Sequence, residues 1–109
     1  LGSFYIIQAL AGLLNFEAQV KAFFDNLEHT EHFPLQNAAP RDTHKKKFTG
    51  MAEACAKVLK VCFEAAEEVL APADPGSPHD DTAACRKSIQ ADFENCFKSS
   101  DKRLNRLLQ

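Results

Sequence analysis

The chain has 109 residues, of which 45% are hydrophobic and 26% are charged, and its formal net charge is −2. This length and composition are typical of a single soluble domain. The near balance of charge predicts no general attraction to nucleic acid, and the apolar stretch at 4–14 is too short to span a membrane.

The first predicted helix runs from about residue 3 to residue 27. Its apolar residues recur at alternating spacings of three and four, the period of a helix with one buried face: Ile6, Ala9, Leu13, Phe16, Val20, Phe23 and Leu27. A second apolar row, formed by Phe4, Ile7, Leu10 and Leu14, makes the first half of this helix apolar on nearly every side. Such a helix is either central to its fold or half covered by a partner.

The rest of the chain predicts further helices and no strand. An irregular loop is expected at about 28–41, where Pro34 and Pro40 interrupt the pattern. A second helix follows at about 42–71 and ends before Pro72. A third helix is expected at about 82–99, and Ser99-Ser-Asp101 predicts a break before a short fourth helix at about 101–108. The predicted fold class is all-α, a small bundle of about four helices in one domain.

Four cysteines lie in the last two long helices, and helix geometry discriminates between their three possible pairings. Cys55 and Cys62 are seven residues apart, roughly 10 Å along a helix, and Cys85 and Cys96 are eleven apart, roughly 16 Å. Neither pair can close on itself, because a disulfide needs Cα atoms within about 7 Å. Pairing Cys55 with Cys85 and Cys62 with Cys96 would need parallel helices, which the short connection makes awkward.

The remaining pairing, Cys55 with Cys96 and Cys62 with Cys85, fits an antiparallel hairpin. We therefore predict that the last two long helices form such a hairpin, cross-linked by two disulfides. Four cysteines in so short a chain also favour an oxidising compartment, so we expect a secreted, extracellular protein.

No catalytic arrangement stands out, and we expect no enzyme, cofactor or metal. The stretch Glu28-His29-Thr30-Glu31-His32 could contribute zinc ligands, but we interpret it as the polar end of a helix. Two basic runs are candidate partner-binding residues: Arg41, Lys45, Lys46 and Lys47, and then Lys102, Arg103 and Arg106. They could dock an acidic protein or a sulfated polysaccharide, and the alternative is an ordinary solvated surface.

Nine phenylalanines predict a Phe-rich interior, which could be a packed core or could line a ligand cavity. Tyr5, Ile7 and Phe24 lie off the main apolar row and are candidates for an exposed apolar interface.

The spacings Cys55-x6-Cys62 and Cys85-x10-Cys96, in an all-helical chain of this length, resemble those of small salivary proteins of blood-feeding flies. The mosquito anophensin/albicin family is one comparison, and the sand-fly salivary complement inhibitor is a second. The resemblance implies a secreted, non-enzymatic inhibitor of a host plasma protein complex. Complement is expected first, with the alternative-pathway convertase favoured, and then the contact system. No functional residue transfers from it.

Two other functions stay open. One is a secreted carrier of a small hydrophobic ligand in a Phe-lined cavity between the first helix and the hairpin. The other is a membrane-active protein that uses the apolar first helix. For all of these we expect a monomer.

Overall fold

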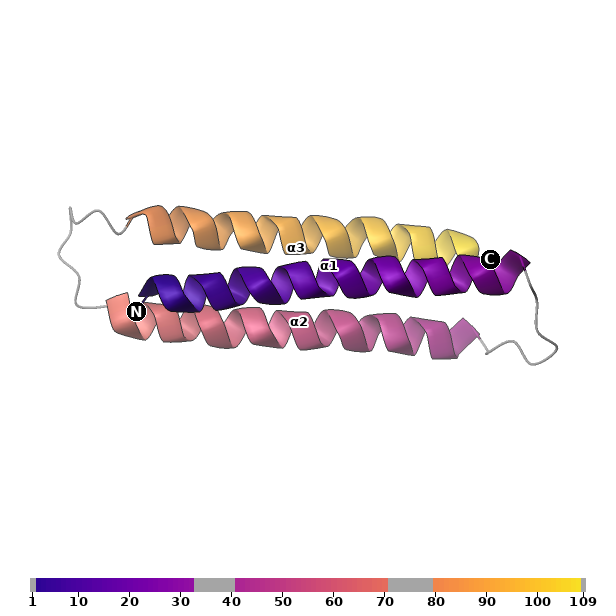
Figure 1. Ribbon diagram of the computed structural model, residues 1–109, viewed down its shortest axis with the longest axis horizontal. Helices are drawn as coiled ribbons and strands as arrows, with labels where there is room; N and C mark the ends of the chain where they lie inside the picture. Colours follow the sequence, from indigo (N-terminus) through magenta and orange to yellow (C-terminus); the bar gives the residue numbers. More distant parts are fainter. Residues whose placement is uncertain (1, 33–40, 71–79, 109) are drawn as a thin grey trace.

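Three long helices make up the described part of the chain, and it contains no strand (Figure 1). The computed structural model describes the backbone of residues 2–32, 41–70 and 80–108, and the side chains of 3–29, 42–69 and 83–108. Helix α1 spans Gly2–His32, α2 spans Arg41–Leu70 and α3 spans Asp80–Leu107. Each helix runs opposite to the one before it, so α1 and α3 are parallel and α2 is antiparallel to both.

The prediction of about four helices is wrong, because α3 continues through Ser99-Ser100-Asp101 without a break. The hydroxyl of Ser99 donates a hydrogen bond of 3.3 Å to the carbonyl of Cys96, one turn earlier in the same helix. Ser100 is buried, with its Oγ 4.0 Å from the Cys96 sulfur. Both hydroxyls are therefore satisfied within the helix. The buried face then continues to Leu104, so packing favours one uninterrupted helix.

Helix α1 is five residues longer than predicted at its carboxyl end, so the first part of the expected loop at 28–41 is helical. Residues 33–40 of that loop lie outside the described residues. The bundle is a rod of 62 × 17 × 17 Å with a radius of gyration of 17.6 Å. A compact chain of this length would have a radius of about 13 Å, so the length of the helices sets the shape of the protein.

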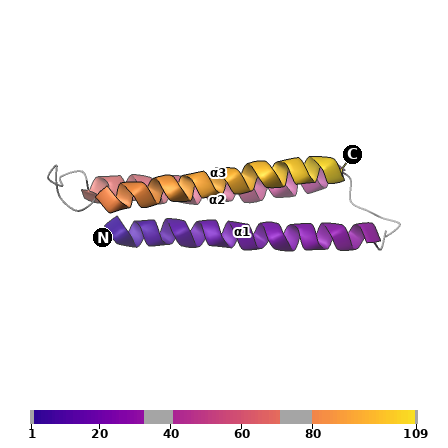
Figure 2. The same ribbon diagram turned by 90° about the horizontal axis from the view of Figure 1, so that it is seen from above.

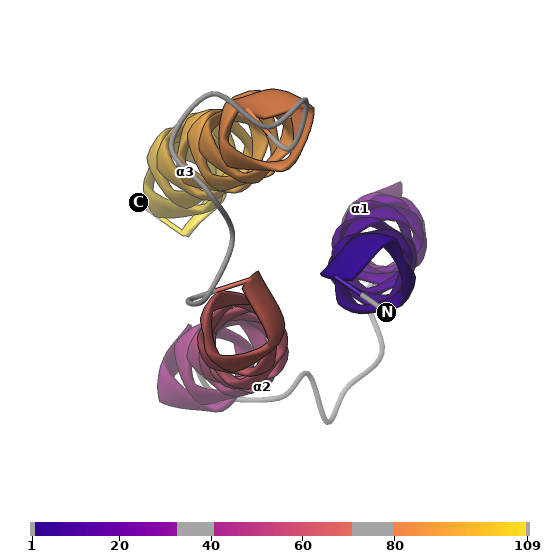
Figure 3. The same ribbon diagram turned by 90° about the vertical axis from the view of Figure 1, so that its left-hand side faces the viewer.

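Seen end-on, the three helices lie at the corners of a triangle (Figure 3). Helix α1 packs most extensively against α2 and less against α3, while α2 and α3 meet each other least. The view from above shows α1 running along the pair formed by α2 and α3 (Figure 2). Its predicted apolar row is buried along its whole length, from Ile6 to Leu27. Helix α1 is therefore central to the fold, which is one of the two alternatives that its apolar surface left open, while its second apolar row stays exposed.

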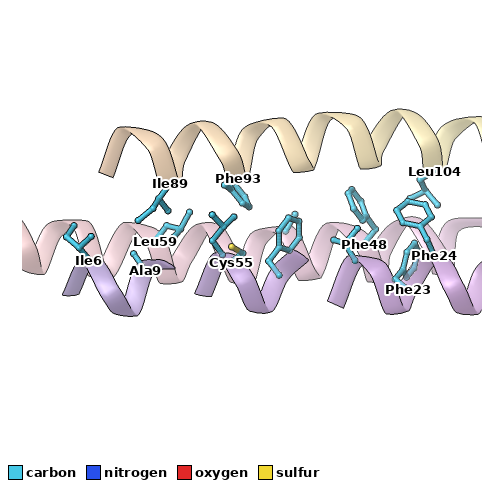
Figure 4. Close-up of a cluster of buried hydrophobic side chains, with 14 of the residues drawn as sticks. Ile6, Ala9, Phe23, Phe24, Phe48, Cys55, Leu59, Ile89, Phe93 and Leu104 are labelled. Carbon is cyan, nitrogen blue, oxygen red and sulfur yellow. The ribbon is translucent and has the colours of Figure 1, made fainter. Parts of the chain in front are cut away.

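The core contains a connected set of aromatic rings, which we call the aromatic column: Phe16, Phe23, Phe24, Phe48, Phe93 and Phe97. Phe48 of α2 joins the other two helices, with ring centroids 6.1 Å from Phe23 of α1 and 5.7 Å from Phe97 of α3. Phe16 and Phe93 join α1 to α3 at 5.3 Å. Five of these residues are buried and Phe97 is half-buried, and Figure 4 shows several of them between the helices.

The core differs in composition along the rod. Towards the amino end of α1 the buried side chains are aliphatic and partly small, among them Ile6, Ala9, Leu59, Ala66 and Ile89. There α1 and α2 approach closely at Gly12, whose carbonyl accepts a weak hydrogen bond of 3.8 Å from the Cys55 thiol. A methyl group on Gly12 would lie 2.9 Å from Cγ1 of Val58. Glycine at this position therefore permits the close contact.

The predicted cross-linked hairpin is also wrong, because all four cysteines are free thiols. Cys55 is buried, Cys62 and Cys96 are half-buried and Cys85 is exposed. The physical reason is the geometry of α2 and α3. These helices are antiparallel as predicted, but of the three helix pairs they contact each other least, and few of their Cα atoms come within disulfide range.

Burial makes the Cys55 thiol unreactive. Burial, the charge of a Cys96 thiolate and the Glu17 carboxylate, in that order, raise the pKa of Cys55 to about 11. Burial likewise raises the pKa of Cys96. Since the thiolate is the reactive form, both side chains stay protonated and inert near neutral pH.

Alkylation of the native protein at neutral pH tests the state of the cysteines. We expect N-ethylmaleimide to modify Cys85 first and Cys55 last, without prior reduction, and denaturation to expose four reactive thiols. Mass spectrometry of timed samples measures the order. A denatured protein that takes up no label until it is reduced would contradict the free thiols.

The raised pKa of Cys55 also predicts that the free energy of unfolding falls from about pH 9 to pH 11, because the unfolded chain releases the Cys55 proton first.

Gly12 and Gly50, which both lie in the interior of a helix, form a matched pair. Nothing lies within 4 Å of a methyl group placed on Gly50, so Gly50→Ala should stabilise the protein by roughly 0.5–1 kcal/mol. Gly12→Ala should gain less, because Val58 is in the way and valine has one strongly preferred rotamer in a helix. Chemical denaturation measures both, and Val58→Ala should restore the gain of Gly12→Ala. Equal gains in the wild-type background would show that Gly12 is not needed for close packing.

Candidate functional site

The fold brings the two predicted basic runs to one end of the rod. Helix α2 begins and α3 finishes at this end, beside the carboxyl end of α1 (Figure 1). We call it the basic end and define it by six side chains, all exposed: Lys45, Lys46 and Lys47 of α2, and Lys98, Lys102 and Arg106 of α3. The side chain of Arg41 lies outside the described residues. Two basic runs that are distant in sequence therefore share one region of the surface.

Helix periodicity arranges the α3 part of the basic end as a stripe. Lys98, Lys102 and Arg106 are spaced four residues apart, so they project from successive turns on one face. Arg106 lies in the last turn of α3, where the helix dipole favours a cation. The three lysines of α2 lie in its second turn, beyond the first turn where the helix dipole acts most strongly.

Arg103 has a different role from its neighbours. Its Nη2 forms an ion pair with Oε1 of Glu28 in α1, and its guanidinium lies over the ring of Phe24, 4.4 Å from the centroid. These contacts join the end of α3 to α1 next to the aromatic column. Among the predicted partner-binding residues, Arg103 thus already makes contacts with other residues of this chain.

A shallow groove of about 730 Å³ lies beside the basic stripe, between α1 and α3. It is lined by Glu17 of α1 and by Asp92, Asn95, Cys96, Lys98, Ser99 and Lys102 of α3. The ammonium groups of Lys98 and Lys102 can donate hydrogen bonds to a partner's carboxylates, and the amide of Asn95 and the hydroxyl of Ser99 can also form hydrogen bonds. Two carboxylates share the groove, so it does not favour a small, highly charged anion such as phosphate.

Apart from Lys102, the polar lining of this groove is not among the features that the sequence predicts. Asn95, Ser99 and Lys102 recur at spacings of four and three, which places them on one helix face. This spacing is the available signal, but it is equally typical of a solvated helix surface. Glu17 belongs to another helix, and its proximity depends on how α1 and α3 pack.

The opposite half of the rod carries no excess of positive charge. Among its described side chains acidic and basic residues are equal in number: Glu64, Glu67, Glu68 and Asp92 against Lys57, Lys60, Arg86 and Lys87. One ion pair, Arg86 Nη1 with Glu67 Oε1 at 2.7 Å, joins α3 to α2 there. The first sixteen residues of the chain contain no charged side chain. The excess of positive charge among the described side chains is therefore confined to the basic end.

The possible zinc ligands do not form a site in the part of the chain that the structure describes, where no group of three His, Cys, Asp or Glu side chains could hold a metal ion. His29 is exposed on α1. His44 is half-buried with its ring edge-on to Phe23, at 6.4 Å between centroids. The side chains of Glu31 and His32 lie outside the described residues.

Substitutions at neighbouring positions of α3 separate structural from surface cations. Arg103→Ala should destabilise the protein by about 1 kcal/mol, because it removes the ion pair with Glu28 and the contact with Phe24. Lys102→Ala, next to it on the exposed stripe, should change stability by less than about 0.5 kcal/mol. Urea unfolding followed by circular dichroism measures both. Equal effects would show that Arg103 is not held by α1.

None of the three helices, within the described residues, combines the length and apolar content that a membrane crossing requires. No protein-family model, curated protein or solved structure matches the chain.

Proposed function

We propose that the protein is a non-catalytic binding module that docks an acidic surface of another protein through its basic end. The observation that supports this proposal is the convergence of Lys45, Lys46 and Lys47 with the stripe of α3 at one end of a helical rod. Asp42 and Asp101 lie at the same end, so the six cations there exceed the acidic side chains among them. The groove beside the stripe adds hydrogen-bonding groups that could select among acidic partners.

The rod suits this role physically. The backbone of the basic end belongs to long helices that are packed on the aromatic column, so little backbone ordering is needed on binding. The positive charge of the basic end also attracts an acidic partner and raises the association rate. Because these side chains are exposed, the attraction should weaken strongly as the salt concentration rises.

The finer proposal concerns the partner. The resemblance to salivary proteins of blood-feeding flies suggests a secreted inhibitor that binds a host plasma assembly, with complement first and the alternative-pathway convertase favoured. The basic end provides the docking surface that such an inhibitor needs. Inhibition would come from occupying a surface of the assembly, with no chemical step.

The carrier hypothesis has less support from the fold. The rings of the aromatic column contact one another at centroid distances of 5.3–6.5 Å, so they fill much of the space between the helices. A phenylalanine-lined site for a ligand would need these rings to separate.

Serum lysis of red cells, run under classical-pathway and alternative-pathway conditions, tests the proposal. We expect the wild-type protein to reduce lysis in the alternative-pathway assay. The triple variant Lys45→Glu, Lys46→Glu, Lys102→Glu should need at least about ten times more protein for the same effect, because it reverses charge on the docking surface.

The matched control is Lys57→Glu, Lys60→Glu, Lys87→Glu, which makes the same change of charge at exposed lysines away from the basic end. It should keep its potency within about twofold. Equal losses in both triple variants would reject the basic end as the docking surface. Undiminished lysis with the wild-type protein under both conditions would reject complement as the partner.

A further inference from the structure

A row of apolar side chains faces outward on the first half of α1. We call it the outer seam and define it by Phe4, Ile7, Ala11 and Leu14, all exposed. Phe4, Ile7 and Leu14 have 55%, 62% and 57% of their surface exposed. On the neighbouring α2, Val58 lies against Gly12 of α1, and Val61, one turn further along, is 60% exposed.

The spacing of the outer seam is that of a helix-packing face. Its members are three, four and three residues apart, the same alternation as in the buried row from Ile6 to Leu27. Helix α1 therefore presents two packing faces, of which the bundle covers only one. Isolated apolar residues on a surface are normal, whereas a continuous row at helix-packing spacing is a candidate interface.

We propose that the outer seam binds the outer seam of a second copy of this chain, with the two α1 helices antiparallel across a two-fold axis. The axis would pass near residue 9, so that Ile7 of each copy faces Ala11 of the other and Phe4 faces Leu14. On either side of the axis, the large Ile7 side chain of one copy then meets the small Ala11 side chain of the other. Such an interface must be complementary to itself.

The charge distribution favours a second copy in this orientation. Because the seam and the whole chain up to Phe16 carry no charged side chain, two copies can meet there without repulsion between like charges. The antiparallel arrangement points the two basic ends in opposite directions. A parallel arrangement would place them side by side and repel.

The area of the seam predicts a weak dimer. The row is about 15 Å long at 1.5 Å per residue, and with the flanking part of α2 it is about 20 Å wide. A face on the order of 300 Å² per copy is well below the ~800 Å² per partner of a standard interface. We therefore expect a reversible dimer that forms at tens to hundreds of micromolar.

The surrounding charges argue against a membrane as the occupant. The nearest described charged residues along α1 and α2 include both signs, among them Glu17, Lys21 and Glu68. A helix that lies on an anionic bilayer is typically flanked by cations alone.

Sedimentation velocity over about 5–500 µM tests the proposal. We expect the wild-type protein to shift from monomer to dimer across this range. Ile7→Lys alone and Ala11→Glu alone should each stay monomeric, because each places a charge in the seam. An equimolar mixture of the two variants should form dimers again, since the introduced lysine of one copy would face the introduced glutamate of the other. Ala91→Glu, at an exposed position of α3, should dimerise like the wild type.

Circular dichroism confirms that each variant is folded before it is compared. A wild-type protein that stays monomeric at every concentration overturns the proposal. If that monomer binds vesicles of phosphatidylcholine and phosphatidylserine, the seam is a membrane-contact surface instead. Failure of the mixed variants to dimerise, when the wild type does, overturns the antiparallel pairing.

Discussion

The packing of the aromatic column is the interaction on which the rest of the structure depends. Its rings join all three helices, with Phe48 of α2 between Phe23 of α1 and Phe97 of α3. Rings of this size bury a large apolar area, and offset or edge-to-face contacts add to the stability. One of these contacts joins α2 to α3, the two helices that otherwise contact each other least and whose cysteines stay reduced.

The same packing fixes the position of the candidate site. Because α3 continues as one helix past Ser100, its basic residues extend along the rod to the place where α2 begins. Arg103 then holds this part of α3 to α1 through Glu28 and Phe24, which leaves Lys98, Lys102 and Arg106 on the surface. One cation of the run stabilises the fold, and its neighbours are available to a partner.

The sequence predicts the helices well because their apolar period is regular, and the buried row of α1 agrees residue by residue with the expectation. The prediction from sequence fails where the outcome depends on the distance between residues of different helices. The predicted disulfides rest on spacing along two helices, whereas the separation between helices depends on rings whose contacts no spacing reveals. Ser99-Ser-Asp101 is a reasonable break by local propensity, but the buried face that continues to Leu104 outweighs it. Of the three off-row residues, Ile7 is exposed, while Phe24 is buried and Tyr5 is half-buried. The meeting of two basic runs follows from topology, and Glu17 in the groove follows from packing alone.

The unequal contacts of the three helices have a consequence for how the protein opens. Helices α1 and α2 are adjacent in sequence and share the largest contact, whereas α3 touches both of them less. Local contacts form early in folding, so the α1–α2 hairpin is the natural first unit and α3 docks on it afterwards. In the reverse direction, α3 is the segment whose partial unfolding costs the least free energy. Its release would uncover Cys55 and Cys96 together, so hydrogen exchange and thiol chemistry would report the same opening event.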